Sequence, residues 1–344
     1  MPEREKLEQD RRRRSGLARW LLGLVIGVGA VWVAITVTGG FADAGDSLRQ
    51  LSVPWLLSAF AVETLSYGVL GAKLRQLIGP EVVTNRESVE LGLVLSGLGP
   101  LTPASPAEGL ALVSKHLRRR GVTNRRITMA LALSEWFSMR VFLLVSAVNL
   151  LVVGAIERDP IRDLWPFILA ALGVLVLLGI TARMAATPTA AVRVSSFAGA
   201  FRRPSRRHPV EERRAAGAEW HHDARQIVGS PRHRAMLASS TATALLADIA
   251  CLWFALRAGG ANVGFDVAML AVTVSAAATL VPLVPGGLGI VEAAIPAVAH
   301  HFGVPYDRGL AAALAYRALG TFMPASVGLL AVFTLRSHFA PAEA

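Results

Sequence analysis

The sequence predicts an all-α polytopic membrane protein, and three observations support this fold class. Hydrophobic residues make up 53% of the 344 residues and charged residues only 17%, whereas an ordinary soluble domain has about 25% charged residues. Apolar stretches of roughly 20 residues, the length needed to cross the hydrocarbon core, recur along the chain. The net charge of +11 comes from arginines clustered between those stretches. Such clusters are typical of cytoplasmic loops, so we expect no nucleic-acid partner.

Six of the apolar stretches are expected to be full transmembrane helices, and two others are interrupted by proline and glycine. The expected full spans are 17–38, 53–72, 127–155, 164–182, 235–257 and 309–335. The interrupted segments are 88–114 and 267–300. The first span is longer than the apolar region of a signal peptide, so we expect it to be retained.

These elements divide the chain into five expected parts. They are a basic N-terminus (1–16), a first membrane half (17–182), an arginine-rich loop (183–234), a second membrane half (235–337) and a tail (338–344). Because positively charged loops stay in the cytoplasm, we expect both termini and the loop on the cytoplasmic side of the cell membrane. The loop is either a solvated linker or a surface that lies on anionic lipid.

The first interrupted segment is expected to enter the membrane and return to the same side. Basic residues flank it on both sides, with Lys73, Arg75 and Arg86 before it and Lys115 to Arg126 after it. Three prolines between Pro100 and Pro106 prevent a continuous helix at its centre. We therefore expect 88–114 to form a re-entrant hairpin with both ends in the cytoplasm.

The second interrupted segment is expected to enter from the opposite side. It is broken at 282–289, and its flanks 258–266 and 300–308 are poor in lysine and arginine, so both can lie outside. Each half of the chain then has a span, a broken hairpin and another span, in opposite orientations. Inverted repeats with paired broken segments are typical of transporters, and the breaks indicate the substrate site.

Ionisable residues inside the expected membrane segments repeat with this pattern. The first half contributes Glu63, Glu108 and Glu135, and the second half contributes Asp248, Glu292 and Arg317. Charged groups at the membrane centre are usually functional or paired. We therefore predict that Glu63, Asp248 and Glu135 carry protons or form ion pairs.

A substrate site is predicted between the two broken segments. The candidate residues are Glu108, Glu292, Arg140, Arg317, Tyr316, Gly286 and Gly287. Arginine forks suit a phosphate, and glycine-rich backbone at a helix start can bind an anion.

Most of these candidates also have a purely structural interpretation. Glu108 and Glu292 can instead cap half-helices. Arg140 can instead pair with Asp248 or Glu63, and Arg317 with Glu292. Neither a catalytic motif nor a metal or cofactor signature is apparent, and the single Cys251 excludes a disulfide within the chain.

Two stretches near the C-terminus resemble a known family. Residues 285–289 read Pro-Gly-Gly-Leu-Gly, Glu292 follows, and Tyr316 and Arg317 come about 25 residues later. This pattern resembles the membrane region of lysylphosphatidylglycerol synthase/flippase proteins and of their stand-alone relatives. In the first half, 102–109 keeps Glu108 but lacks the glycines that are usual in the family.

The resemblance implies a flippase-like membrane domain. Aminoacyl transfer in the family needs a large soluble domain after the membrane part, and this sequence ends at Ala344, so we do not expect an enzyme. We expect translocation of a phospholipid or a polyprenyl-linked substrate. Membrane lipids with anionic head groups are the expected partners, with a homo-oligomer or an envelope-biosynthesis enzyme as further options. The alternatives are an ion-coupled transporter of a small polar solute and a non-transporting partner of an envelope glycosyltransferase.

Overall fold

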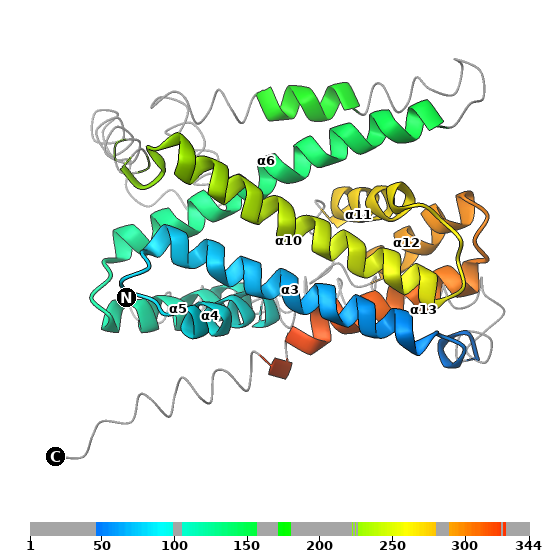
Figure 1. Cartoon of the computed structure of the whole chain (residues 1–344), viewed down its shortest axis with the longest axis horizontal. Helices are drawn as coiled ribbons and strands as arrows, with labels where there is room; N and C mark the ends of the chain where they lie inside the picture. Colours follow the sequence, from blue (N-terminus) through cyan, green and yellow to red (C-terminus); the bar gives the residue numbers. More distant parts are fainter. Residues whose placement is uncertain are drawn as a thin grey trace, which may run out of the picture. The chain divides into compact units, whose positions relative to one another are not determined.

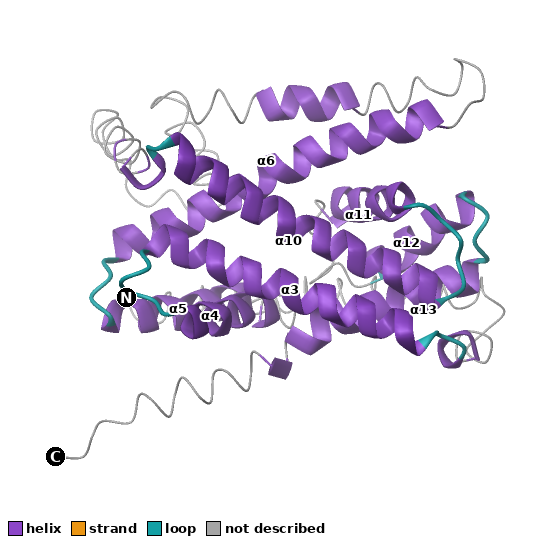
Figure 2. Ribbon diagram, viewed as in Figure 1, coloured by secondary structure: helices purple, strands orange, loops and turns teal. Residues whose placement is uncertain are grey.

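The described part of the chain is helical. The computed structural model describes residues 46–98, 105–156, 171–179, 222, 224, 226–279, 289–324 and 326–327, and none of these residues lies in a strand. Figure 2 shows the helices and the short turns that join them. The expectation of an all-α fold is therefore confirmed for this part of the chain.

Three of the described helices are long and apolar enough to cross a membrane. They are α3 (Val53–Ile78), α6 (Asn124–Ile156) and α10 (Pro231–Ala258), labelled in Figure 1. They coincide with the spans expected at 53–72, 127–155 and 235–257. Large apolar side chains such as Leu57 and Val148 are more than half exposed on them, as helices that face lipid require.

The remaining described helices are shorter. They are α4 (Asn85–Leu98), α5 (Ser105–Arg119), α11 (Phe265–Thr279), α12 (Ile290–His301), α13 (Tyr306–Arg317) and the π-helix η2 (Ala318–Phe322). At 1.5 Å per residue, the first four are each about 18–23 Å long, shorter than the roughly 30 Å of hydrocarbon. They occupy the two segments expected to be broken. Residues 171–179 are helical too.

Other expected elements lie partly or wholly outside the described residues. The span at 17–38 and the break at 282–288 lie wholly outside them, and so do most of the arginine-rich loop and the tail. Of the span at 164–182 the structure describes 171–179, and of the span at 309–335 it describes α13, η2 and a few further residues.

Two boundaries of the span-length helices differ from expectation by four residues or more. Helix α3 continues six residues past the expected end of the span at 72, and α10 starts four residues before 235. The sequence suggested earlier ends because Lys73 and Arg234 were assigned to loops. Polar residues can extend a membrane helix beyond the hydrocarbon core, so charge marks the edge of the membrane and not the end of the helix.

The chain forms two compact units that alternate along the sequence. Unit 1 comprises residues 1–68, 89–115 and 246–344, and unit 2 comprises 69–88 and 116–245. Each unit therefore takes residues from both expected membrane halves. Helices α3 and α10 each contribute to both units.

In unit 1, the start of α3 packs against the end of α10. The backbone N–H of Ser52 donates to the Ala258 carbonyl at 2.9 Å. The Trp55 ring lies 6.4 Å from that of Trp253 and stacks on Phe254 at 5.7 Å. The two helices are therefore antiparallel at this end. Clustered aromatic rings are typical of a membrane–water interface.

The C-terminal helices of unit 1 pack in sequence order. Helix α12 packs against both α11 and α13. Helix α12 starts after Gly289, whose φ of 81° favours glycine, and contains Pro296. A Cβ atom placed on Gly309 of α13 would lie 3.0 Å from the Pro296 Cα. Glycine at 309 therefore permits the close approach of these two helices.

Candidate functional site: a buried polar cluster in unit 1

Seven polar side chains from four elements of unit 1 make two sets of contacts that adjoin at Tyr316 and Arg317, and we call them together the polar cluster. Its members are Glu63, Tyr67, Asp248, Cys251, Glu292, Tyr316 and Arg317. Helix α3 supplies the first two, α10 the next two, α12 supplies Glu292 and α13 the last two. Six of the seven come from span-length helices or from the adjoining α13, where charged groups are rare unless they are paired or functional.

The two carboxylates on the long helices lie at matching positions. Glu63 is ten residues after the start of α3, and Asp248 is ten residues before the end of α10. Because these ends of the antiparallel helices meet, both carboxylates lie about 15 Å from the shared end. That distance corresponds to about the middle of a 30 Å hydrocarbon core.

Glu63 is the most deeply buried carboxylate of the cluster. It is 2% exposed, and it contacts the Tyr67 hydroxyl and the Cys251 thiol. Its Oε2 atom has no hydrogen-bond partner among the described residues, nor does any described Lys, Arg or His form an ion pair with it. Tyr67 donates its own proton to the Gly320 carbonyl at 3.0 Å. In an apolar site without a cation, a carboxyl group is far less costly neutral than ionised.

Asp248 and Tyr316 join α10 to α13. The Tyr316 hydroxyl lies 2.9 Å and 3.1 Å from the two carboxylate oxygens of Asp248 and donates to this carboxylate. A phenol is a strong donor to a carboxylate, and such hydrogen bonds contribute more than neutral ones. The contact fixes the end of α13 beside the middle of α10.

Glu292 and Arg317 join α12 to α13. Arg317 Nε donates to Glu292 Oε1 at 3.0 Å, and the two side chains are only 11% and 6% exposed. The other oxygen of Glu292 accepts the backbone N–H of Gly289 at 2.7 Å. Both structural alternatives for Glu292, the helix cap and the ion pair, are thus present in this conformation.

A π-helical turn follows Arg317 directly. Residues Ala318–Phe322 form η2, and a Cβ on Gly320 would lie 3.6 Å from Glu63 Oε1. Short π-helical turns inside helices occur frequently at functional sites. This turn brings the Gly320 backbone to the Glu63 and Tyr67 side of the cluster.

The structure brings together some of the predicted site residues. Glu63, Asp248 and Tyr316 lie in one set of contacts of the polar cluster. Glu292 and Arg317 pair with each other. Arg140 and Glu135 lie on α6 in unit 2. The Arg140 guanidinium lies 4.6 Å from the centre of the Trp136 ring, so its pairing with Asp248 or Glu63 stays a prediction. The Glu108 side chain and Gly286 and Gly287 lie outside what the structure describes.

Three further residues were not predicted from the sequence to belong to a site. Tyr67 follows Glu63 by one helical turn, a spacing that places both on one helix face. Cys251, three residues after Asp248, is buried as expected for a small apolar side chain. Lys73 was assigned to a cytoplasmic segment, but it is 3% exposed in α3 and donates to Ser138 Oγ at 2.9 Å. Glu135 acts electrostatically on this lysine.

The outer ends of α4 and α5 are held together in unit 2. Glu87 at the start of α4 pairs with Arg120 just after α5, and its Oε1 lies 3.7 Å from His116 Nε2. The Thr84 N–H and hydroxyl both donate to Glu87 Oε2 at 3.0 Å. Burial alone would raise the Glu87 pKa, but these donors and cations outweigh it and lower the pKa below its usual value.

These features define a multi-pass helical membrane protein with a buried polar cluster. The family defined by the lysylphosphatidylglycerol synthase TM region matches residues 20–328, and the chain belongs to that family. The resemblance seen at 285–292 and 316–317 is thereby confirmed. A search of curated proteins found no match to the sequence.

Proposed function

We propose that the protein translocates a phospholipid or a polyprenyl-linked lipid across the cytoplasmic membrane. The observation that carries the proposal is the polar cluster of unit 1, in which an arginine–glutamate pair on α12 and α13 adjoins, through Tyr316, the carboxylates on α3 and α10. A charge-rich site at membrane depth has little structural purpose in itself, because apolar packing would be at least as stable. It suits a polar head group that must pass through hydrocarbon.

The substrate phosphate is proposed to bind at Arg317. In the present conformation the Arg317 side chain is engaged by Glu292, which can act as a substitute for the phosphate. Binding of a phosphate would release Glu292 from the arginine while Glu292 keeps the Gly289 N–H. Tyr316, the preceding residue, would transmit that change to Asp248 on α10.

Glu63 and Asp248 are proposed to hold a proton that crosses the membrane when the lipid substrate is translocated. Two neighbouring carboxylates in a low-dielectric interior do not both ionise readily, because each disfavours the charge of the other. Glu63 has no described cation beside it. A proton that is taken up from one side and released to the other would couple the cluster to a membrane gradient.

The proposed architecture is an inverted repeat with two re-entrant hairpins. The short lengths of α4, α5, α11 and α12 support it, as do the joined ends of α4 and α5 at Glu87. In this arrangement the first hairpin enters from the cytoplasm, the second enters from outside, and six full spans surround them. The proline- and glycine-rich centres of the two segments expected at 88–114 and 267–300 would face the substrate path.

Reconstituted vesicles test the function. Purified full-length protein is placed in vesicles that carry a trace of fluorescent phosphatidylglycerol, and an impermeant reductant bleaches the outer leaflet. We expect wild-type protein to expose nearly all of the label, against about half in protein-free vesicles, and Arg317→Ala and Glu292→Gln to slow the movement at least tenfold. Arg49→Ala, which alters an arginine that is 86% exposed, is the matched control.

Two results would contradict the proposal. If vesicles with wild-type protein exposed no more label than protein-free vesicles, lipid translocation would not be the function. If Arg317→Ala and Glu292→Gln both moved the lipid at the wild-type rate, the polar cluster would not take part in the mechanism.

A further inference from the structure

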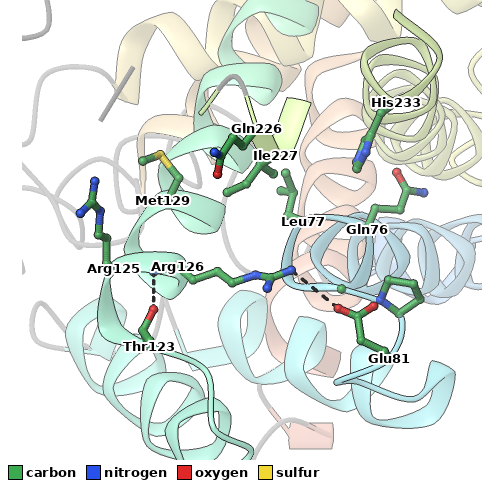
Figure 3. A pocket seen from close by; sticks show the side chains of 12 residues that line it. Gln76, Leu77, Glu81, Thr123, Arg125, Arg126, Met129, Gln226, Ile227 and His233 are labelled. Atoms are coloured by element: carbon green, nitrogen blue, oxygen red, sulfur yellow. Dashed lines mark hydrogen bonds and ion pairs between the residues drawn. The ribbon is translucent and has the colours of Figure 1, made fainter. Parts of the chain in front are cut away.

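Unit 2 contains a pocket that the polar cluster does not include. It has a volume of about 480 Å³, in the range of small-ligand sites. Three segments surround it (Figure 3), namely the end of α3 with its following turn, the start of α6, and the start of α10 with the residues before it. All three segments are predicted from charge to lie on the cytoplasmic side.

The starts of two helices converge on this pocket. Thr123, Arg125 and Arg126 at the start of α6 and His233 at the start of α10 line it. Neither helix has an acidic residue in its first turn, although a helix start favours negative charge and disfavours arginine. Two positive helix ends and two arginine side chains therefore line one cavity.

Little negative charge lines the pocket opposite these helix starts. The carbonyls of the turn that follows α3 are engaged by Arg75, which donates to Val83 at 2.8 Å and to Pro80 at 3.2 Å. Glu81 is the one acidic side chain among the lining residues. It pairs with Arg126 at 3.7 Å, and it is 65% exposed, so the pair is weak.

One wall of the pocket has unused hydrogen-bonding capacity. Gln76 Oε1 and His233 Nε2 are buried atoms without a partner in the described part of the chain. In Figure 3 both side chains extend from the wall opposite Arg125. Buried polar atoms are usually satisfied, and this wall can hold a ligand that accepts from the imidazole and donates to the amide oxygen. The apolar side chains Leu77, Met129 and Ile227 complete the lining.

We infer that this pocket binds the phosphate group of a lipid head group at the cytoplasmic surface, before translocation. A phosphodiester accepts hydrogen bonds from arginine and from helix-start N–H groups, and a hydroxyl on the head group matches Gln76. The apolar lining suits the glycerol end of a lipid better than it suits free phosphate. The inference rests on the proposed function, since it assigns the first contact of the same substrate.

Binding of short-chain lipid to the full-length protein in detergent tests the inference. The probes are dihexanoyl-phosphatidylglycerol and inorganic phosphate, and the readout is the rise in Tm with probe concentration. We expect the lipid to bind, Arg126→Gln to weaken its binding at least tenfold, and Glu81→Gln to tighten it severalfold because the competing carboxylate is gone. Arg232→Gln is the matched control, because Arg232 is exposed and does not line the pocket.

The outcomes separate the alternatives. Unchanged lipid binding in both Arg126→Gln and Glu81→Gln, or an equal loss in Arg232→Gln, would overturn the site. Inorganic phosphate that binds as tightly as the lipid would overturn the lipid as the source of the phosphate. Binding is measured in detergent, without translocation, so the two proposals can fail separately. If the variants bound the lipid as well as the wild type while wild-type vesicles still moved lipid, this inference would be wrong and the proposed function would stand.

Discussion

Arg317 Nε lies 3.0 Å from Glu292 Oε1, with both side chains nearly buried where α12 meets α13. Removing one member of such a pair leaves the other charge buried and unpaired, which costs about 3–5 kcal/mol. We expect Arg317→Met alone to lower the free energy of unfolding by that amount, and the double variant with Glu292→Gln to be more stable than Arg317→Met. Denaturant unfolding in detergent measures both.

The exposed pair Arg49 and Asp46 is the control for this cycle. Its side chains are 86% and 66% exposed, so Arg49→Ala is expected to change stability by less than about 0.5 kcal/mol. If the changes in the free energy of unfolding caused by Arg317→Met and Glu292→Gln simply added in the double variant, the two side chains would not stabilise each other as a buried ion pair.

The Tyr316 hydroxyl is expected to stabilise the contact between α10 and α13. Tyr316→Phe removes the donor to Asp248 and leaves a partly buried carboxylate without it, which costs about 1–3 kcal/mol. Tyr306→Phe, on the same helix, is the control and is expected to have little effect. Equal stability of the two variants would argue against a tight Tyr316–Asp248 contact.

The close approach of α12 and α13 is expected to depend on glycine at 309. Gly309→Val would force its side chain against Pro296, because a Cβ at position 309 already lies 3.0 Å from the Pro296 Cα, and overpacking costs about 1–3 kcal/mol. We expect a lower Tm for this variant in detergent. Gly68→Val, where a Cβ meets nothing within 4 Å, should unfold at nearly the wild-type temperature.

The contact that Glu87 makes between α4 and the residue after α5 is expected to weaken in acid. The folded-state pKa of Glu87 lies below its usual value of 4.5, so its stabilisation is complete above pH 4.5 and is lost as the pH falls through the folded-state pKa. Hydrogen exchange of α4 and α5 against pH measures this loss. Glu87→Gln should exchange faster at neutral pH and should lack the acid-dependent step.

Charge and hydropathy predicted the helical class and three helices that are long and apolar enough to span a membrane. They also singled out four ionisable residues that the structure places in the polar cluster of unit 1, because Glu63, Asp248, Glu292 and Arg317 stand out in apolar surroundings. Contacts between distant helices could not be predicted in this way. The partner of Arg317 had two candidates, and the sequence did not indicate that Tyr316 reaches Asp248.

Lys73 shows the limit of inferring topology from charge. A lysine near the end of an apolar stretch is typical of a loop, yet here serines one turn apart on α6 provide its oxygen ligands. The pocket of unit 2 was equally hidden, because it combines residues from three segments more than 40 positions apart. Local patterns carry no information about such convergence.

Two broken hairpins that enter the membrane from opposite sides are central to the proposed transport, and labelling of single cysteines tests them directly. Cysteine is introduced at Asn85, Arg118, Asn262 or Pro305, all exposed, while the native Cys251 is buried. An impermeant thiol reagent applied to intact cells should label 262 and 305 but not 85 and 118, which should react only after the membrane is opened. Labelling of 85 and 118 from different sides would contradict the inverted architecture.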